Sequence, residues 1–331
     1  MSINKNFPKS PYDIIDPGVR WYPGVSLIRE IGLQNLLPPL VHNLRVKVKE
    51  WREDSYKGAS DTSKALLYYW FDTEHLITNP DGTTTLFRYY FAQREAVETI
   101  IYLHDVVQIK DKYDLMRFDS SGYVRAGLFD ENWIRYVIKM ATGTGKTKVL
   151  SLIVAWSYFN KLYDQTSDLA RNFLIITPNI IVLDRIKDDF DGLDIFFEDP
   201  ILPPNGYENQ NWHDDFQLSV HLQDEVNIVN KYGNIFLSNI HRVFDNNQKE
   251  PSLEDRDTTE YFLGPKPVLR TTESKIDLGD IVRDIDELMI LNDEAHHIHD
   301  PSLAWFKSIQ DIQNHLVQKG SYLSMQLDVT A

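Results

Sequence analysis

The sequence contains no cysteine among its 331 residues. This absence excludes a disulfide scaffold, a cysteine nucleophile and any metal site built from thiolates. No apolar run approaches the ~20 residues of a membrane span, and the N-terminal segment lacks the apolar core of a signal peptide. We therefore expect a cytoplasmic protein with no membrane partner. Apolar residues make up 42 % and charged residues 25 % of the chain, which is a globular composition.

Basic residues are fewer than acidic ones, 34 against 49, so the net charge is −15. Averaged over the chain, this charge weighs against nucleic-acid binding. The acidity is concentrated, however, because residues 181–230 carry a net −10 and residues 251–300 a net −8. The remaining residues carry a net +3 and could face a phosphate backbone. Acidic blocks of this kind are more often solvated insertions than functional sites, and the role of both blocks stays open.

Residues 1–85 differ in composition from the rest, and we predict that they form an N-terminal α+β accessory region. The region opens with segments punctuated by proline and glycine and continues with a helix that carries basic residues over 45–52. A turn signal at 79–82 separates two apolar pairs and predicts a hairpin. The basic helix could touch nucleic acid or present an ordinary solvated face.

From residue 87 onward, short apolar runs alternate with helical patterns. The runs predict strands at 134–140, 172–177, 234–238, 288–292 and 323–329, and the helical patterns cover 93–103 and 146–158. Such alternation is typical of crossover units in an α/β fold, with a mainly parallel sheet covered on both faces. We expect the first of these strands to be buried.

A glycine-rich segment at 140–147, Met-Ala-Thr-Gly-Thr-Gly-Lys-Thr, lies between a predicted strand and a predicted helix. Glycines allow backbone N–H groups to turn toward phosphate oxygens, and the helix N-terminus adds partial positive charge. Lys146 would contact the β- and γ-phosphates, and the Thr147 hydroxyl would ligate Mg²⁺. Met140 replaces the first glycine of the general pattern, and a simple flexible turn is the alternative. The other residues predicted to contact the nucleotide are Thr142, Gly143, Thr144 and Gly145.

Two carboxylates, Asp293 and Glu294, follow the predicted strand 288–292. Carboxyl ends of parallel strands share one sheet edge, so these residues should lie at the edge that carries the glycine-rich segment. Asp293 would reach Mg²⁺ through a water, and Glu294 would polarise the water that attacks the γ-phosphate. A solvated acidic turn is one alternative. A transition-metal site of a metal-dependent hydrolase is another, built on His296, His297 and His299.

The 140–147 segment and the sequence Asp-Glu-Ala-His at 293–296 resemble motifs I and II of superfamily 2 DEAD/DEAH-box helicases and translocases. Gln93 stands where that family has an adenine-reading glutamine, the Q motif. Residues 177–179 resemble motif Ia, which touches the nucleic-acid backbone, and residues 238–241 resemble motif Ib. Residues 329–331 resemble the beginning of motif III. The family's pattern implies that His296 couples the ATP site to motif III.

Within the superfamily, the chain resembles in particular the restriction (Res) subunit of type III restriction endonucleases, on residues 91–103, 140–147 and 292–300. The resemblance covers about residues 86–331 and implies a RecA-like P-loop NTPase domain, the first of two, that uses ATP and Mg²⁺. It implies an ATP-dependent helicase or translocase on double-stranded DNA, with a DNA methyltransferase subunit as partner. The second domain, with its arginine finger, would follow residue 331. We therefore expect an N-terminal fragment that binds Mg-ATP but hydrolyses it slowly.

Other functions remain open as alternatives. The chain could be a stand-alone, ATP-gated binding module without motor activity. It could also be an RNA-directed DEAH-box helicase, because contacts to a nucleic-acid backbone carry no sequence information. Tyr89, Tyr90 and Phe91 could stack on adenine or belong to the core. Six tryptophans are expected at core or sheet-edge positions rather than on a base-stacking platform: Trp51, Trp70, Trp133, Trp156, Trp212 and Trp305.

Overall fold

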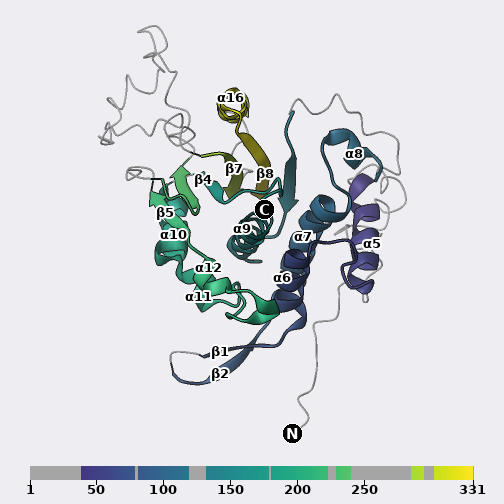
Figure 1. The fold of residues 1–331 in the computed structure, drawn as a ribbon, viewed down its shortest axis with the longest axis vertical. Coiled ribbons are helices and arrows are strands. Elements are labelled where there is room, and N and C mark those ends of the chain that lie inside the picture. The colour runs from purple at the N-terminus through teal and green to yellow at the C-terminus, as the bar shows by residue number, and fades with distance from the viewer. Residues whose placement is uncertain are drawn as a thin grey trace, which may run out of the picture.

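A six-stranded sheet forms the centre of the molecule (Figure 1). The computed structural model describes residues 39–78, 81–118, 132–178, 180–222, 229–239, 285–293 and 302–330. All neighbouring strands of the sheet pair in parallel, which confirms the predicted α/β fold. Their order is β3 (Arg135–Lys139), β8 (Tyr322–Thr330), β7 (Glu287–Asp293), β4 (Asn172–Thr177), β6 (Asn234–Asn239) and β5 (Ser219–Leu222).

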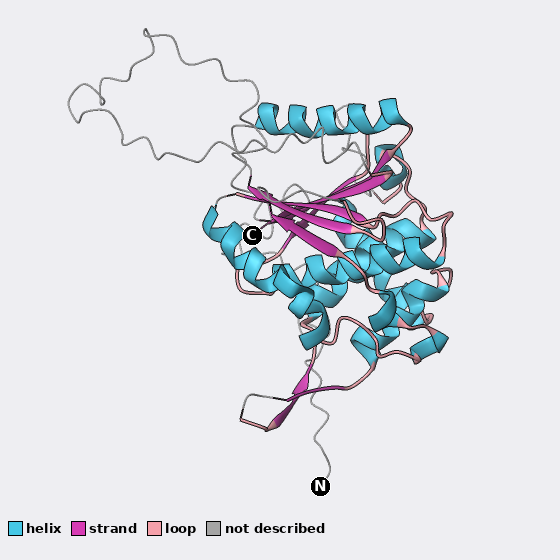
Figure 2. Ribbon diagram, turned by 60° about the vertical axis from the view of Figure 1, so that its left-hand side comes forward, coloured by secondary structure: helices cyan, strands magenta, loops and turns pink. Residues whose placement is uncertain are grey.

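Helices cover both faces of this sheet (Figure 2). One face carries α16 (Ser302–Lys319), and the other carries α9 (Lys146–Tyr163), α10 (Ile180–Phe190) and the remaining helices. None of the helices in the described ranges is both long and apolar enough to cross a membrane. The remaining helical segments are α5 (Pro39–Glu53), α6 (Asp61–Asp72), α7 (Phe91–Ile101), η1 (Tyr102–Val106), α8 (Lys112–Met116), η3 (Asp191–Leu193), α11 (Asp194–Glu198), η4 (Tyr207–Asn209) and α12 (Trp212–Asp215).

The strand side chains divide between two hydrophobic clusters because successive residues of a strand point to opposite faces. In β4, Phe173 and Ile175 pack into the larger cluster around α9, whereas Leu174 and Ile176 pack into the smaller cluster under α16. Helix α9 is buried on every side through its middle, and its Trp156 is fully buried. The sheet is therefore packed on both faces, with one hydrophobic cluster on each.

The predicted hairpin in the N-terminal region is confirmed as β1 (His75–Thr78) paired antiparallel with β2 (Thr84–Phe87). The predicted basic helix is α5. Side chains from α5 and α6, among them Trp51, Leu66 and Trp70, belong to the same hydrophobic cluster as α9. The segments on either side of residue 85 thus share one core.

One expectation about burial is wrong. The strand expected to be buried, β3, lies at the edge of the sheet formed by the described residues, where β8 is its one neighbour, and Val137 is 61 % exposed. The acidic block 181–230 is not a solvated insertion over its described part. Its aromatic residues Phe190, Phe196 and Trp212 are fully buried in the α9 cluster, so the charges lie on the outside of a packed segment.

The tryptophan prediction holds for every described indole. Five of the six are at most 9 % exposed, and the side chain of Trp305 lies outside the described residues. The other acidic block, 251–300, lies outside them as well except for residues 285–293.

Candidate nucleotide-binding site

Three strands bring the glycine-rich segment and the motif II strand to one edge of the sheet. β3 leads into the segment 140–147, β7 ends at Asp293, and β8 lies between them. Residue Asp293 pairs with Val329, and the Met140 N–H donates to the Thr330 carbonyl at 2.8 Å. Adjacent strands are about 4.8 Å apart, so the ends of β3 and β7 are separated by roughly 10 Å.

The glycine-rich segment, called the phosphate loop from here on, has two residues in the left-handed region. Gly143 has φ +79° and Gly145 has φ +78°, conformations that glycine adopts without the steric cost of a Cβ. The Thr144 hydroxyl donates to the Ala141 carbonyl at 2.6 Å and closes the loop. Helix α9 begins directly afterwards at Lys146, whose side chain is 7 % exposed. A helix N-terminus presents backbone N–H groups that suit an anion.

Gln93 lies against the phosphate loop, although it is 52 residues away in the chain. Its Oε1 accepts the Tyr90 N–H at 2.8 Å, and its Nε2 donates to the Gly145 carbonyl at 3.4 Å. The residue is 4 % exposed, and a Cβ added at Gly145 would overlap its Nε2. The start of α7 is therefore docked on the loop, and Gly145 is required by close approach as well as by its φ angle.

The aromatic residues before α7 divide between the core and the surface. Tyr89 is 8 % exposed, and its hydroxyl donates to the Pro200 carbonyl at 3.0 Å, so it belongs to the core. Burial raises the pKa of Tyr89 well above its usual value, and the hydroxyl stays protonated. Tyr90 is 64 % exposed beside Gln93. Phe91 packs under the Arg52 guanidinium at 5.7 Å.

Sequence reasoning missed Arg185 on α10. Its Nη2 lies 3.4 Å from Asp293 Oδ2, and Asp293 is 2 % exposed. The guanidinium thus balances the charge of a buried carboxylate, which would be costly alone. A usable signal was present, because Arg185 and Lys187 are the only basic residues in the acidic block 181–230.

Lys148, one position past Thr147, is held on the other side of the helix start. It forms an ion pair with Asp199, next to the Pro200 that accepts the Tyr89 hydroxyl. Burial lowers the pKa of Lys148, and the acidic neighbours Asp189 and Glu198 oppose that effect. A cleft of about 770 Å³ begins beside Asp199 and runs to strand β1, and its lining includes none of the predicted site residues.

Several predicted site residues lie outside the described residues. They are Glu294, His296, His297, His299, Asn179 and His241. Thr177 of the motif Ia segment is described and buried, and its hydroxyl donates to the Ser238 carbonyl at 3.5 Å. Over the described ranges, no group of three or more histidine, aspartate or glutamate side chains could hold a metal ion.

Comparison with known proteins identifies the family of the chain. No curated protein and no solved structure matches the chain significantly. A family model described as the type III restriction enzyme, res subunit, matches residues 87–331. The matched range contains the phosphate loop, Gln93 and Asp293, and the family is a helicase-like ATPase family of the DEAD-like superfamily 2. Because the match spans well over half of the chain, the chain belongs to the type III restriction enzyme res subunit family.

Proposed function

We propose that the chain binds Mg-ATP at the phosphate loop and hydrolyses it as the motor part of a type III restriction enzyme-like protein. In this proposal hydrolysis drives movement on double-stranded DNA in the cytoplasm, and a DNA methyltransferase subunit is the partner. The main support is the contact between Gln93 and Gly145. It joins an adenine-reading position to the phosphate loop, as a site for one adenine nucleotide requires.

The proposed roles of the loop residues follow from their positions. Lys146 would bind the β- and γ-phosphates as a point charge. The backbone N–H groups of residues 142–147 and the start of α9 would surround the phosphate oxygens. The positive φ angles of Gly143 and Gly145 support this, because they turn the loop at two positions where a side chain would be strained.

The donors near the loop fit a magnesium ion. Thr147 offers a hydroxyl in the first turn of α9, and Asp293 offers a carboxylate at the same sheet edge, both oxygen ligands that Mg²⁺ prefers. A bound Mg²⁺ would neutralise charge on the phosphates. Glu294 would polarise the attacking water, and His296 would couple the site to motif III. An arginine finger from a second RecA-like domain would raise the rate about 10³–10⁵-fold.

The first experiment measures the affinity of Lys146→Ala for a fluorescent ATP analogue with Mg²⁺. Losing charge-assisted contacts to phosphate should weaken binding about 10- to 100-fold. Lys148→Ala is the matched control, because it removes a lysine from the same turn whose ion pair, with Asp199, lies away from the phosphate loop. Its affinity should stay within about threefold of the wild type. Equal binding by Lys146→Ala and the wild type would overturn the proposal.

The second experiment separates hydrolysis from binding and DNA from RNA. Glu294→Gln should bind the analogue like the wild type but lose ATP turnover, since the amide cannot accept a proton. Turnover by the wild type should rise when double-stranded DNA is added and stay unchanged with RNA. Stimulation by RNA alone would favour the RNA helicase reading, and binding without any turnover would favour the binding module.

A further inference from the structure

A buried polar network lies on the α16 face of the sheet, directly behind the proposed site. Its members are Asp328 and Gln326 on β8, Asn292 on β7, Arg135 at the start of β3, and Trp133 just before that strand. Asp328 is 1 % exposed, and Asn292 and Gln326 are fully buried. Leucine and isoleucine occupy neighbouring positions on this face, so polar side chains here are not needed for packing.

The Asp328 carboxylate is the centre of the network. Its Oδ2 accepts from Arg135 Nε at 2.8 Å and Nη2 at 2.7 Å. Its Oδ1 accepts from Gln326 Nε2 at 2.9 Å and from Asn292 Nδ2. A single side chain on the central strand is therefore bonded to the strands on both sides, β3 and β7.

The arrangement carries a cost that an apolar face would avoid. A buried carboxylate loses its hydration, and only a full set of donors makes this tolerable. Asn292 uses its amide N–H for Asp328, while its own Oδ1 has no hydrogen-bond partner among the described residues. Buried polar atoms of this kind in a native protein call for an explanation beyond packing.

The three bonded strands are those that end at the proposed site. β3 leads into the phosphate loop, β8 ends at Thr330, and β7 ends at Asp293. Asn292 immediately precedes Asp293, and the two side chains point to opposite faces of the sheet. Holding Asn292 from the α16 face thus fixes the backbone that presents Asp293 on the α9 face.

We propose that Asp328 is a positioning residue that holds Asp293 and the phosphate loop at the spacing a magnesium nucleotide requires. It acts on Asp293 through Asn292 and on the loop through Arg135 and β3. The inference rests on the proposed function, since it assigns Asp293 to the metal. It adds Asp328, Asn292 and Arg135 to the residues on which that site depends.

The test compares the affinity for the fluorescent ATP analogue with Mg²⁺ and with EDTA. Asp328→Asn keeps the shape of the side chain but replaces one acceptor oxygen by an NH₂ group. This group cannot accept the hydrogen bonds that Arg135 or Asn292 donates. Misplacing Asp293 should reduce the gain in affinity from Mg²⁺ about 10-fold, as changes behind a metal ligand commonly do. The affinity in EDTA, to which the phosphate loop contributes without the metal, should fall less than the affinity with Mg²⁺. Asn292→Ala should give the same result by the same path and serves if Asp328→Asn does not fold.

Trp133→Phe is the matched control within the network. It removes the Trp133 Nε1 bond to Gln326 Oε1, 2.8 Å in length, and leaves the bond between Asn292 and Asp328 in place. It should lower the unfolding temperature yet keep the wild-type gain from Mg²⁺. The inference would be overturned if Asp328→Asn and Asn292→Ala kept the full gain in affinity from Mg²⁺, or if Trp133→Phe lost as much of that gain as they do. Either result would leave the proposed function standing. Absence of any nucleotide affinity in the wild type would instead remove the proposed function.

Discussion

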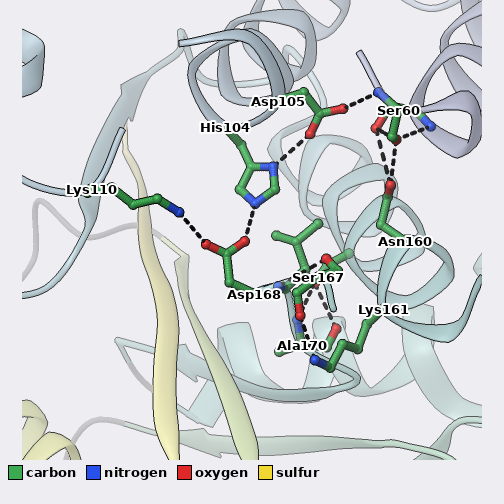
Figure 3. A network of polar contacts seen from close by, with 12 residues as sticks. Ser60, His104, Asp105, Lys110, Asn160, Lys161, Ser167, Asp168 and Ala170 are labelled. Atoms are coloured by element: carbon green, nitrogen blue, oxygen red, sulfur yellow. Dashed lines mark hydrogen bonds and ion pairs between the residues drawn. The ribbon is translucent and has the colours of Figure 1, made fainter. Parts of the chain in front are cut away.

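The two ends of helix α9 are held in different ways. At its N-terminus, Gly145 has a positive φ, and among the described residues no side chain caps the first turn. At its C-terminal end, Asn160 is 5 % exposed and accepts the Ser60 hydroxyl at 2.6 Å, while Lys161 Nζ donates to the Ser167 carbonyl at 2.5 Å (Figure 3). One end thus leaves backbone donors for a ligand, and the other is tied by side chains.

The difference shows how one helix can serve stability and binding at separate points. An uncapped N-terminus costs stability that an anion can restore on binding. The C-terminal contacts hold the helix by side chains alone and involve no ligand. Changes at the C-terminal end should therefore alter unfolding and spare affinity, whereas changes at the N-terminal end should lower affinity.

Trp156→Ala should give the largest effect on stability. The indole is fully buried, and its Nε1 donates to Ser63 Oγ at 2.8 Å. Removing it should lower the free energy of unfolding by about 3–5 kcal/mol, because a large cavity remains. Urea unfolding followed by circular dichroism measures the loss. Affinity for the ATP analogue, measured well below the transition, should stay within about threefold of the wild type.

Val317→Ala is the control for this change. Val317 lies on α16 and is 59 % exposed, so its truncation should cost no more than about 0.5 kcal/mol. If Trp156→Phe, which keeps most of the volume, still lost nucleotide affinity at full folding, the separation between the two ends of α9 would be wrong.

The strands of this fold could be predicted from sequence where apolar runs are short and sharply bounded. β4 was predicted with its observed ends, and β6, β7 and β8 differ by one or two residues, because each is buried on both faces. β5 was missed, since its Ser-Val-His-Leu sequence lies inside an acidic block and reads as polar. The exposure of β3 was missed because a sheet edge is set by strand order, which local pattern does not encode.

The candidate site was only partly accessible from sequence. The phosphate loop and Asp293 can be predicted from the sequence, because their glycine, lysine and carboxylate residues lie next to apolar strands. The contact of Gln93 with Gly145 depends on how α7 docks, and the Arg185 pair with Asp293 spans 108 residues, so local sequence encodes neither pairing. Arg185 itself stands out only as a basic residue in an acidic block. The Asp328 network did leave a signal in the sequence. Gln326 and Asp328 alternate with Leu327 and Val329 in a strand predicted to be buried on both faces.

The C-terminal end of α9 should also make stability depend on pH through His104. Its ring packs on Trp156. It also contacts Asp105 and Asp168, each at 2.7 Å (Figure 3). Burial lowers the pKa of His104, but the two carboxylates outweigh it and raise the value to about 9. The hydrogen bond from His104 holds the pKa of Asp168 well below its usual range, so this carboxylate stays charged.

The sign follows from comparing folded and unfolded states. An unfolded histidine has a pKa of about 6.5, so below that pH both states are protonated and the stabilisation is complete. It is lost as the pH rises toward 9. The free energy of unfolding should fall by about 2–3 kcal/mol from this group between pH 6.5 and 9.5. Urea titrations across this range should show the fall in the wild type.

His104→Asn should flatten that dependence, because the asparagine carries no proton that titrates there. His315→Asn is the control, since the His315 ring contacts the Asp311 carbonyl on the exposed side of α16. The free energy of unfolding of His315→Asn should fall with pH as it does in the wild type. If the free energy of unfolding of His104→Asn fell with pH as steeply as that of the wild type, His104 would not be the source of the pH dependence.

Gly145→Ala tests the N-terminal end and should give the smallest change in free energy. The new Cβ would meet Gln93 Nε2, and the positive φ adds strain. Either the glutamine or the loop must move, so affinity for the ATP analogue should fall about 10-fold, which is about 1.4 kcal/mol. Gly82→Ala is matched in strain, with φ +80° and open space around it, but lies in the hairpin turn. It should destabilise folding similarly and bind the analogue normally.

The double change Gly145→Ala, Gln93→Ala separates strain from overlap. If the overlap with Gln93 is what disturbs the loop, removing that side chain should restore much of the stability lost in Gly145→Ala. Affinity should not recover, because the side chain of Gln93, which we propose reads the adenine, is then absent as well. Recovery of both quantities would mean that Gln93 only fills space beside Gly145, and the N-terminal end of α9 would be built for packing as the C-terminal end is.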